Sequence, residues 1–177
     1  MARFQTVGNE LSFLFLLNCG HVVSLCTMGV TRKKKKVGIT AGALDLCHAG
    51  HFLMLEEARR VCDYLIVCLQ EDPSRDRPEK NKPIMSMAER MTILRGIRWV
   101  DEVVPYKTER DLYNILRSRK PDIRIIGADW KGKLYTGHDL PITMYFNSRS
   151  HSYSSSNIRE RVWAAEDAKR RAKKKKR

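Results

Sequence analysis

A continuous apolar run from Tyr64 to Leu69 constrains the fold of this chain more than any other feature of its sequence. The run has the length of a strand, and a strand without apolar–polar alternation is typical of parallel sheets that are covered on both faces. The segment before it, 50–62, repeats Leu55, Ala58 and Cys62 at helical spacing. A helix followed by a doubly buried strand indicates an α/β fold.

The alternation of strands and helices continues along the chain. Further strands are expected at 37–40, 103–104, 122–126 and 142–146. Further helices are expected at 86–97, around 112–116 and from 154 towards 163. Ser86 followed by Glu89 is the capping-box pattern of a helix start. Repeated β–α units predict a five-stranded parallel sheet between two layers of helices, with ligands at the carboxyl ends of the strands.

Positive charge is concentrated in two short runs. The formal net charge is +14, but 13 of the 34 lysines and arginines lie at 32–36 and 169–177, and the remaining 21 nearly balance the 20 acidic residues. A nucleic-acid-binding domain is expected to carry its basic face on folded elements. The run at 169–177 repels itself, so residues 165–177 are predicted to be a disordered tail. We interpret it as a solvated end, with weak polyanion binding as the alternative.

Residues 1–35 stand apart from the strand–helix pattern and are predicted to be a leader or an extension with a basic end. The stretch from Leu11 to Val30 is the most apolar of the chain, but Asn18, Gly20 and His21 interrupt it and argue against a membrane span. Our hypothesis is that Met28 is the biological start. The predicted organisation is an extension at 1–35, a folded domain at 36–164 and the tail at 165–177.

The cysteines show no Cys-x-x-Cys spacing and no paired framework; they are Cys19, Cys26, Cys47, Cys62 and Cys68. Their pattern predicts neither structural disulfides nor a zinc site. We therefore expect a reducing compartment and a cytoplasmic protein without a membrane partner.

Two histidines three residues apart, His48 and His51, open the helix after the first strand. A helix N-terminus offers free N–H groups and the positive end of the helix dipole, which together bind phosphate. Side chains at i and i+3 share one face, so both imidazoles can reach the same phosphate group. Gly50 between them lets a ligand approach the backbone closely. The pattern predicts a phosphate site, and two other interpretations remain: histidines that cap or pack, and a metal site that would need further ligands.

Four segments in the same order resemble the HxGH nucleotidyltransferase superfamily, and within it the cytidylyltransferase family. They are Thr40–His51, Ser86–Arg90 with Ile97–Val103, Gly127–Lys133 and Arg149–Arg159. The likeness is strongest to bacterial glycerol-3-phosphate cytidylyltransferases and extends from Val37 to about Arg161. It implies a Rossmann-like three-layer sandwich and makes 36–164 a nucleotidyltransferase domain.

The resemblance also implies the chemistry: a substrate phosphate attacks the α-phosphate of a nucleoside triphosphate, and pyrophosphate leaves without a covalent enzyme intermediate. The implied catalytic residues are His48, His51, Arg98 and Arg149. The implied nucleotide-binding residues are Thr40, Gly42, Ala43, Gly50, Lys80, Lys82, Asp129, Trp130, Ser154, Ser155, Ser156 and Arg159. The histidines would stabilise charge at the α-phosphate, and the serines would bind the β- and γ-phosphates. Lys80 or Lys82 would close over the phosphates like a lid. Mg2+ would arrive with the triphosphate, held by its oxygens and by water rather than by protein side chains.

Several positions depart from the pattern of the relatives. Ala43 stands where relatives have a Thr or Ser that contacts phosphate, and losing that hydroxyl costs on the order of 1 kcal/mol. Ala128 replaces an acidic residue, and His151 replaces a Glu. Leu112 stands where relatives have a lysine that helps hold glycerol phosphate, which bears on the acceptor more than on the reaction. The sequence leaves Arg90 and Arg98 equally open as functional or as solvated helix residues.

The predicted function is transfer of CMP from CTP to a small phosphorylated alcohol such as glycerol 3-phosphate. The segment Asp129–Lys133 favours CTP over ATP by its likeness to the cytidylyl branch. One alternative is an adenylyltransferase that acts on a sugar phosphate or an FMN-like acceptor. Another, of a different class, is a weakened module that binds nucleotides or polyanions. The resemblance further implies a homodimer.

Overall fold

The computed structural model describes residues 6–7, 10–11 and 33–175, in two compact units, Met1–Lys34 and Lys35–Arg177. In the first unit, β1 (Thr6–Val7) pairs antiparallel with β2 (Glu10–Leu11). The hypothesis on Met28 and the predictions for Cys19 and Cys26 lie outside the described residues. Within those residues, no helix has both the length and the apolar character needed to cross a membrane.

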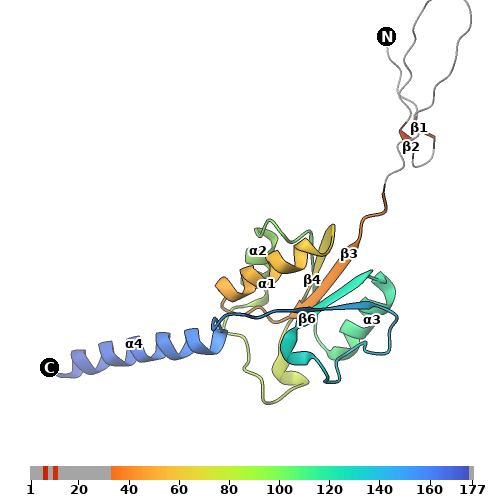
Figure 1. Cartoon of the computed structure of the whole chain (residues 1–177). Helices are drawn as coiled ribbons and strands as arrows, with labels where there is room; N and C mark the ends of the chain where they lie inside the picture. Colours follow the sequence, from red (N-terminus) through yellow and green to blue (C-terminus); the bar gives the residue numbers. More distant parts are fainter. Residues whose placement is uncertain (1–5, 8–9, 12–32, 176–177) are drawn as a thin grey trace, which may run out of the picture. The chain divides into compact units, whose positions relative to one another are not determined.

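The second unit contains the predicted five-stranded parallel sheet (Figure 1). Its strands are β3 (Val37–Gly42), β4 (Tyr64–Gln70), β5 (Glu102–Tyr106), β6 (Ile123–Gly127) and β7 (Thr143–Asn147). They lie in the order β5-β4-β3-β6-β7. From the central strand β3, the strands β4 and β5 follow in sequence on one side, and β6 and β7 lie on the other side. A ligand crevice is expected where the order reverses, at the carboxyl ends of β3 and β6.

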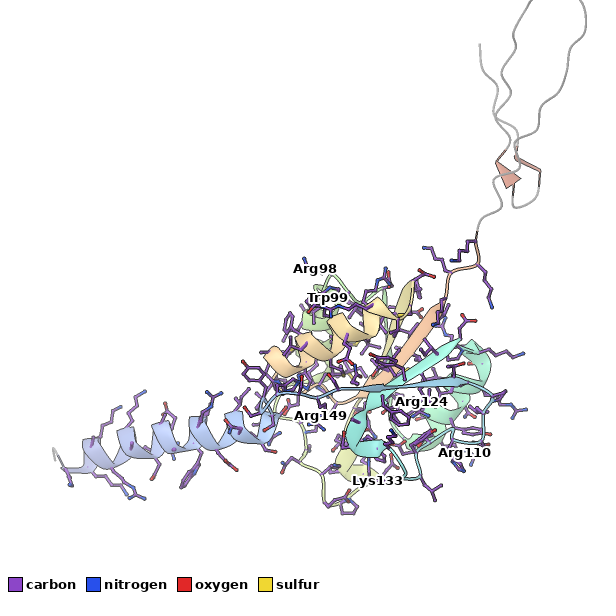
Figure 2. The ribbon with its side chains drawn as sticks, in the orientation of Figure 1. Arg98, Trp99, Arg110, Arg124, Lys133 and Arg149 are labelled. Atoms are coloured by element: carbon purple, nitrogen blue, oxygen red, sulfur yellow. The ribbon has the colours of Figure 1, made fainter. Side chains whose placement is uncertain are left out.

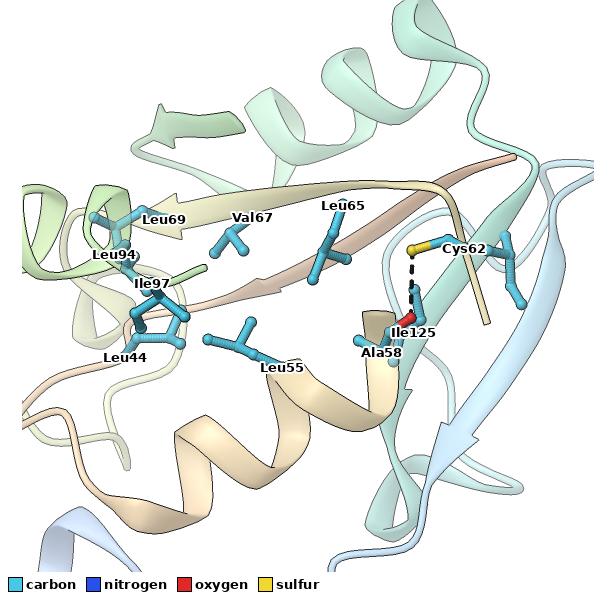
Figure 3. Close-up of a cluster of buried hydrophobic side chains, with 11 residues drawn as sticks. Leu44, Leu55, Ala58, Cys62, Leu65, Val67, Leu69, Leu94, Ile97 and Ile125 are labelled. Atoms are coloured by element: carbon cyan, nitrogen blue, oxygen red, sulfur yellow. Dashed lines mark hydrogen bonds between the residues drawn. The ribbon is translucent and has the colours of Figure 1, made fainter. Parts of the chain in front are cut away.

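Side chains of β4 alternate between two apolar layers, which explains why its sequence shows no polar face. Leu65, Val67 and Leu69 pack with α1 (Ala49–Arg60) and α2 (Met87–Arg95) (Figure 3). Ile66 and Cys68 pack on the other face with Leu112 and Leu116 of α3 (Glu109–Arg119). The expected doubly buried strand and both helical layers are confirmed.

The described cysteines, Cys47, Cys62 and Cys68, are free. Cys62 donates from Sγ to the carbonyl of Ala58 at 3.3 Å, within the core that α1 covers (Figure 3). Burial raises the pKa of the Cys68 thiol to about 12. These thiols act as small packing groups.

Side-chain caps set the helix starts. Ser86 Oγ accepts from Glu89 N at 3.3 Å, and Ser86 N donates to Glu89 Oε2 at 2.8 Å, which confirms the predicted capping box of α2. Thr108 and Asp111 form the same arrangement at α3. Two short 3-10 helices, η1 (Pro73–Arg75) and η2 (Ala128–Trp130), follow β4 and β6.

The last helix, α4 (Ser155–Lys175), is longer than expected. The prediction of a disordered tail is wrong for residues 165–175, which are helical. Ion pairs one turn apart, Arg171 with Asp167 at 2.8 Å and Lys169 with Glu166 at 3.5 Å, offset the repulsion. Lysines in the last turn also lie at the end of the helix dipole that favours cations.

Candidate functional site

The first element of the site is the start of α1, where His48 is the N-cap residue. Its Nδ1 accepts a hydrogen bond from Gly50 N at 3.1 Å, and the Nδ1 of His51 accepts one from His48 N at 3.4 Å. The two histidines therefore do cap the helix, as one of the interpretations of the sequence holds. Capping and phosphate binding are compatible because each uses a different ring nitrogen.

The caps determine which ring nitrogen carries the proton. Because Nδ1 accepts in both rings, a neutral imidazole here carries its hydrogen on Nε2. The Nε2 of either ring has no hydrogen-bond partner in the described part of the chain. The pair thus offers two N–H donors at a helix N-terminus, which suits an oxyanion.

The pKa values of both imidazoles are lowered, which favours the neutral form. Burial first, and then the charges of His151 and Arg149, lowers the pKa of His48. Burial and the neighbouring His48 lower the pKa of His51 to about 4, although Asp45 acts in the opposite direction. Arg149 lowers both values, so its charge lies within electrostatic reach of the pair.

The turn between β3 and α1 is centred on Asp45, which the sequence analysis did not single out. Its carboxylate accepts from Ile84 N at 3.0 Å, from Met85 N at 2.9 Å and from Arg159 Nη2 at 2.7 Å. Burial alone would raise the pKa of Asp45, but the two N–H donors and Arg159 lower it below its usual range. Leu44 and Leu46, on either side, have φ of 45° and 48°. Backbone strain of this kind is often found at functional turns.

The predicted serine cluster lies at the start of α4 and meets the same turn. Ser155 Oγ donates to the Asp45 carbonyl at 2.8 Å, while Ser154 Oγ accepts from Asn157 N at 3.1 Å, and Ser156 is exposed. Arg159 also donates to the Lys82 carbonyl at 2.8 Å. The structure therefore brings the serine cluster and Arg159 to the HxGH turn, with Asp45 as the common partner.

Beside this turn is a cavity of about 990 Å3, which we call the strand-end cavity. Its lining includes the predicted residues Thr40, Gly42, Lys80, Asp129, Trp130 and Arg149. Arg149 donates to Asp129 Oδ1 at 3.1 Å, and both side chains are about half exposed. Arg149 and Met54 also line a smaller cavity of about 380 Å3 that contains His151. Arg149 thus lines both cavities, whereas His48 and His51 line neither and are linked to Arg149 by its electrostatic effect on them.

Other predicted residues are placed differently. Arg98 lines neither cavity: it is exposed, with its guanidinium 4.7 Å from the centre of the Trp99 ring and away from Arg149 (Figure 2). The Lys82 side chain is exposed and lines neither cavity. Ala43 contributes its carbonyl, which accepts from Arg90 Nη1 at 2.8 Å.

Arg90 is an internal anchor rather than a solvated residue. It is 2% exposed and donates to four carbonyls, those of Ala43, Gln70, Glu71 and Met85, at 2.7 to 3.1 Å. Every such bond joins α2 to a loop or strand end. The side chain therefore fixes the walls of the site without facing a ligand.

His151 is a third imidazole at the helix start that sequence reasoning did not count as a site residue. A Cβ on Gly50 would lie 2.6 Å from Cε1 of His151 and 3.0 Å from Cε1 of His48. Glycine therefore fits between these two rings without displacing them. The Nδ1 of His151 is buried and has no hydrogen-bond partner among the described residues. The sequence contained one signal for this residue, the replacement by His151 of a Glu found in relatives.

Comparisons with known proteins agree with this geometry. Residues 39–161 match the model of the Cytidylyltransferase-like family. Glycerol-3-phosphate cytidylyltransferase of Bacillus subtilis is 35% identical over 128 residues, which cover 72% of this chain and 97% of that protein. The bifunctional protein HldE of Campylobacter concisus is 37% identical over 144 residues, 78% of this chain but only 30% of that protein, so the chain spans less than a third of its length.

A solved structure shows the same fold. The lipopolysaccharide core biosynthesis protein from Thermoplasma volcanium superposes with a TM-score of 0.52 at 24% identity, covering 63% of this chain and 93% of that one. The sheet order, the HxGH helix start and the family match all point the same way. The chain belongs to the cytidylyltransferase-like family.

Proposed function

We propose that the protein transfers CMP from CTP to a small phosphorylated alcohol, such as glycerol 3-phosphate, and releases pyrophosphate. The observation that carries this proposal is the pair of Nε2–H donors of His48 and His51 at the start of α1, within electrostatic reach of Arg149, which lines the strand-end cavity. Donors suited to an oxyanion, and a cavity of substrate size lined by the Arg149 that acts on them, together support this reaction.

The reaction proposed is an in-line displacement at phosphorus. An oxygen of the acceptor phosphate forms a bond to the α-phosphorus, and the bond to the oxygen that bridges to the β-phosphorus breaks. His48 and His51 donate to the α-phosphate oxygens, where negative charge increases. The start of α4, with Ser154, Ser155 and Ser156, and Lys80 bind the departing pyrophosphate. Asp129 and Trp130 position the nucleoside, and most of the rate gain comes from positioning and charge.

Magnesium is proposed to bind through the triphosphate. The described residues contain no cluster of three His, Cys, Asp or Glu side chains that could hold a metal ion. The carboxylate of Asp45 is occupied by three donors, and that of Asp129 pairs with Arg149. Triphosphate oxygens and water would therefore supply the ligands, and the ion would neutralise charge on the leaving pyrophosphate.

A sugar-phosphate acceptor, with ATP as the nucleotide, is the second candidate. The strand-end cavity, at about 990 Å3, is at the upper end of the range of small-molecule sites. Glu109, Thr136 and Asp139 in its lining are groups that bind sugar hydroxyls. Glu109 already accepts from Gln70, Arg77 and Thr136, and Asp139 accepts from Tyr113, so sugar hydroxyls would join these existing hydrogen bonds.

We also propose a homodimer. Phe52 and Leu53 of α1 are 40% and 45% exposed, and Phe52 meets Trp99 edge to face at 6.3 Å between ring centroids. An apolar surface of this kind supports association with a second copy.

Pyrophosphate release tests the proposal directly. The protein would be incubated with Mg2+, each of the four nucleoside triphosphates, and a panel of polyol and sugar phosphates. Release with CTP and a polyol phosphate is the expected result, whereas release only with ATP and a sugar phosphate would select the second candidate. Nucleotide binding without release in any combination would contradict the enzyme and favour a binding module.

A further inference from the structure

Arg124 is a buried cation that the proposed reaction has not used. It is the second residue of β6 and is 4% exposed. Ile123 and Ile125 on either side of it face the apolar layer under α1, so Arg124 faces the layer of α3. A guanidinium in such a place is costly unless it is paired and hydrogen-bonded.

The protein supplies that compensation only in part: burial lowers the pKa of Arg124, and the nearby Tyr135 and Glu109 act in the opposite direction without forming an ion pair with it. Nη1 of Arg124 is buried and has no hydrogen-bond partner in the described part of the chain. Across the same residues, none of the ion pairs includes Arg124. Its nearest aromatic contact is the Tyr135 ring, with the guanidinium carbon 5.2 Å from the ring centroid.

Arg90 shows what a structural arginine looks like in this fold. It is buried to the same degree, but it donates to four carbonyls and lines neither cavity. Arg124 lacks these bonds and lines the strand-end cavity. The difference indicates that the partner of Arg124 is a ligand.

The position of Arg124 places that ligand deep in the cavity. It lies level with Ile39 in the middle of β3, three residues before the end of β6, about 10 Å along the strand from the carboxyl edge. Arg149, about half exposed, and Arg124, 4% exposed, line the same cavity. Gly137 closes over it, and a Cβ at Gly137 would lie 3.1 Å from Nη1.

We propose that Arg124 binds an oxyanion of the acceptor substrate and thereby selects acidic acceptors. The identification of the ligand as the acceptor substrate rests on the proposed function, whereas the binding of an oxyanion by Arg124 does not. The oxyanion is either the phosphate that attacks or a second acidic group of the same molecule. A guanidinium binds phosphate or carboxylate through two parallel N–H bonds, which fixes the orientation of the ligand as well as its charge.

The experiment measures binding without nucleotide, by calorimetry, for the wild type and the variants R124Q, R124K and R117Q. Arg117 is an exposed arginine of α3 and serves as the matched control for loss of one charge. The probes are sn-glycerol 3-phosphate, with one phosphate, and 3-phosphoglycerate, with a phosphate and a carboxylate. R124Q is expected to weaken binding by about 10-fold or more, with partial recovery in R124K and no change in R117Q.

The two probes identify the source of the oxyanion. Equal weakening for both assigns Arg124 to the phosphate, and weakening confined to 3-phosphoglycerate assigns it to the second acidic group. Failure of the wild type to bind either probe, or unchanged binding in R124Q, overturns the proposal.

Thermal unfolding of the ligand-free protein gives an independent readout. Removing an unpaired buried charge is expected to leave R124M at least as stable as the wild type, while R90M, which leaves four carbonyls unpaired, is destabilised. A loss of stability in R124M equal to that in R90M would show that Arg124 is structural. Pyrophosphate release plays no part in these measurements, so they fail or succeed separately from the proposed reaction.

Discussion

The imidazole rings of His48 and His51 stack with their centroids 3.9 Å apart and their planes 22° from parallel. Two imidazolium cations at this distance would repel each other strongly, and after burial the neighbouring His48 is the largest cause that lowers the pKa of His51. An anionic ligand would relieve that repulsion. The pair is therefore arranged to respond to the charge of a bound phosphate.

Replacing His48 by Asn separates its two roles. Asn is a good N-cap, so H48N keeps the helix start but removes the Nε2–H donor. Turnover in the pyrophosphate assay should fall by about 10²–10³-fold, as expected for loss of one oxyanion donor. Thermal unfolding should be nearly unchanged, while H48A, which also loses the cap, should be less stable by about 1 kcal/mol. Near-normal turnover of H48N would remove His48 from the mechanism.

Stability should decrease as the solution is acidified from pH 6.5 towards pH 4. The pKa of His51 is about 4 in the folded chain against its ordinary value of 6.5, so the unfolded chain binds more protons in this window. Each pKa unit corresponds to about 1.4 kcal/mol, and the free energy of unfolding falls by up to about 3 kcal/mol. Urea unfolding at several pH values measures this, and H51N should reduce the slope. H138N, at an exposed histidine, serves as the control. If H51N showed the same slope of unfolding free energy against pH as the wild type, His51 would not be the cause of the pH dependence.

Replacing Asp45 by Asn should loosen both segments that it holds. Asn keeps one acceptor oxygen but loses the charge that pairs with Arg159, and we expect a loss of about 1–3 kcal/mol in the free energy of unfolding. Amide hydrogen exchange at Ile84 and Met85 should accelerate, and KM for the nucleotide should rise. Glu79 is an exposed carboxylate in the loop that contains Ile84 and Met85. The control Glu79→Gln should change neither the hydrogen exchange of these amides nor KM.

Deletion of residues 168–177 should leave turnover within about 2-fold of the full chain. The deletion keeps Ser155 and Arg159, which hold α4 to Asp45, and removes helix turns that bury no side chain. The truncated protein should elute from a heparin column at a lower salt concentration, because binding to a polyanion depends on the number of cationic side chains. Loss of turnover would show that the basic helix takes part in catalysis.

The sheet and its helices follow from sequence because their signals are local. The apolar run of β4, the helical spacing of Leu55, Ala58 and Cys62, and the Ser86–Glu89 cap each act within a few residues. The tail was mispredicted because like charges were weighed without the Arg171–Asp167 and Lys169–Glu166 pairs, which lie one turn apart.

The site is only partly predictable for the opposite reason. His48 and His51 could be placed because a helix start and a three-residue spacing define them. Asp45 and Arg90 acquire their roles mainly from hydrogen-bond partners 19 to 114 residues away in the chain, and Arg124 acquires its role from the lack of such a partner at Nη1. Arg98, by contrast, matches the family pattern but lies on Trp99 outside both cavities. A match to the family's sequence pattern therefore does not show which arginine side chain lines the cavity.

The contacts of Asp45 also set the order in which a newly made chain becomes competent. Strands β3, β4 and β5 can pair once residue 106 has left the ribosome, but Ser155 and Arg159 follow Asp45 by 110 and 114 residues. Until they emerge, the proposed phosphate-binding turn lacks the hydrogen bonds that Ser155 and Arg159 make to Asp45. A nascent chain can therefore hold most of its sheet and still lack the proposed site, and on the proposed function nucleotide binding is expected only after synthesis has passed residue 159.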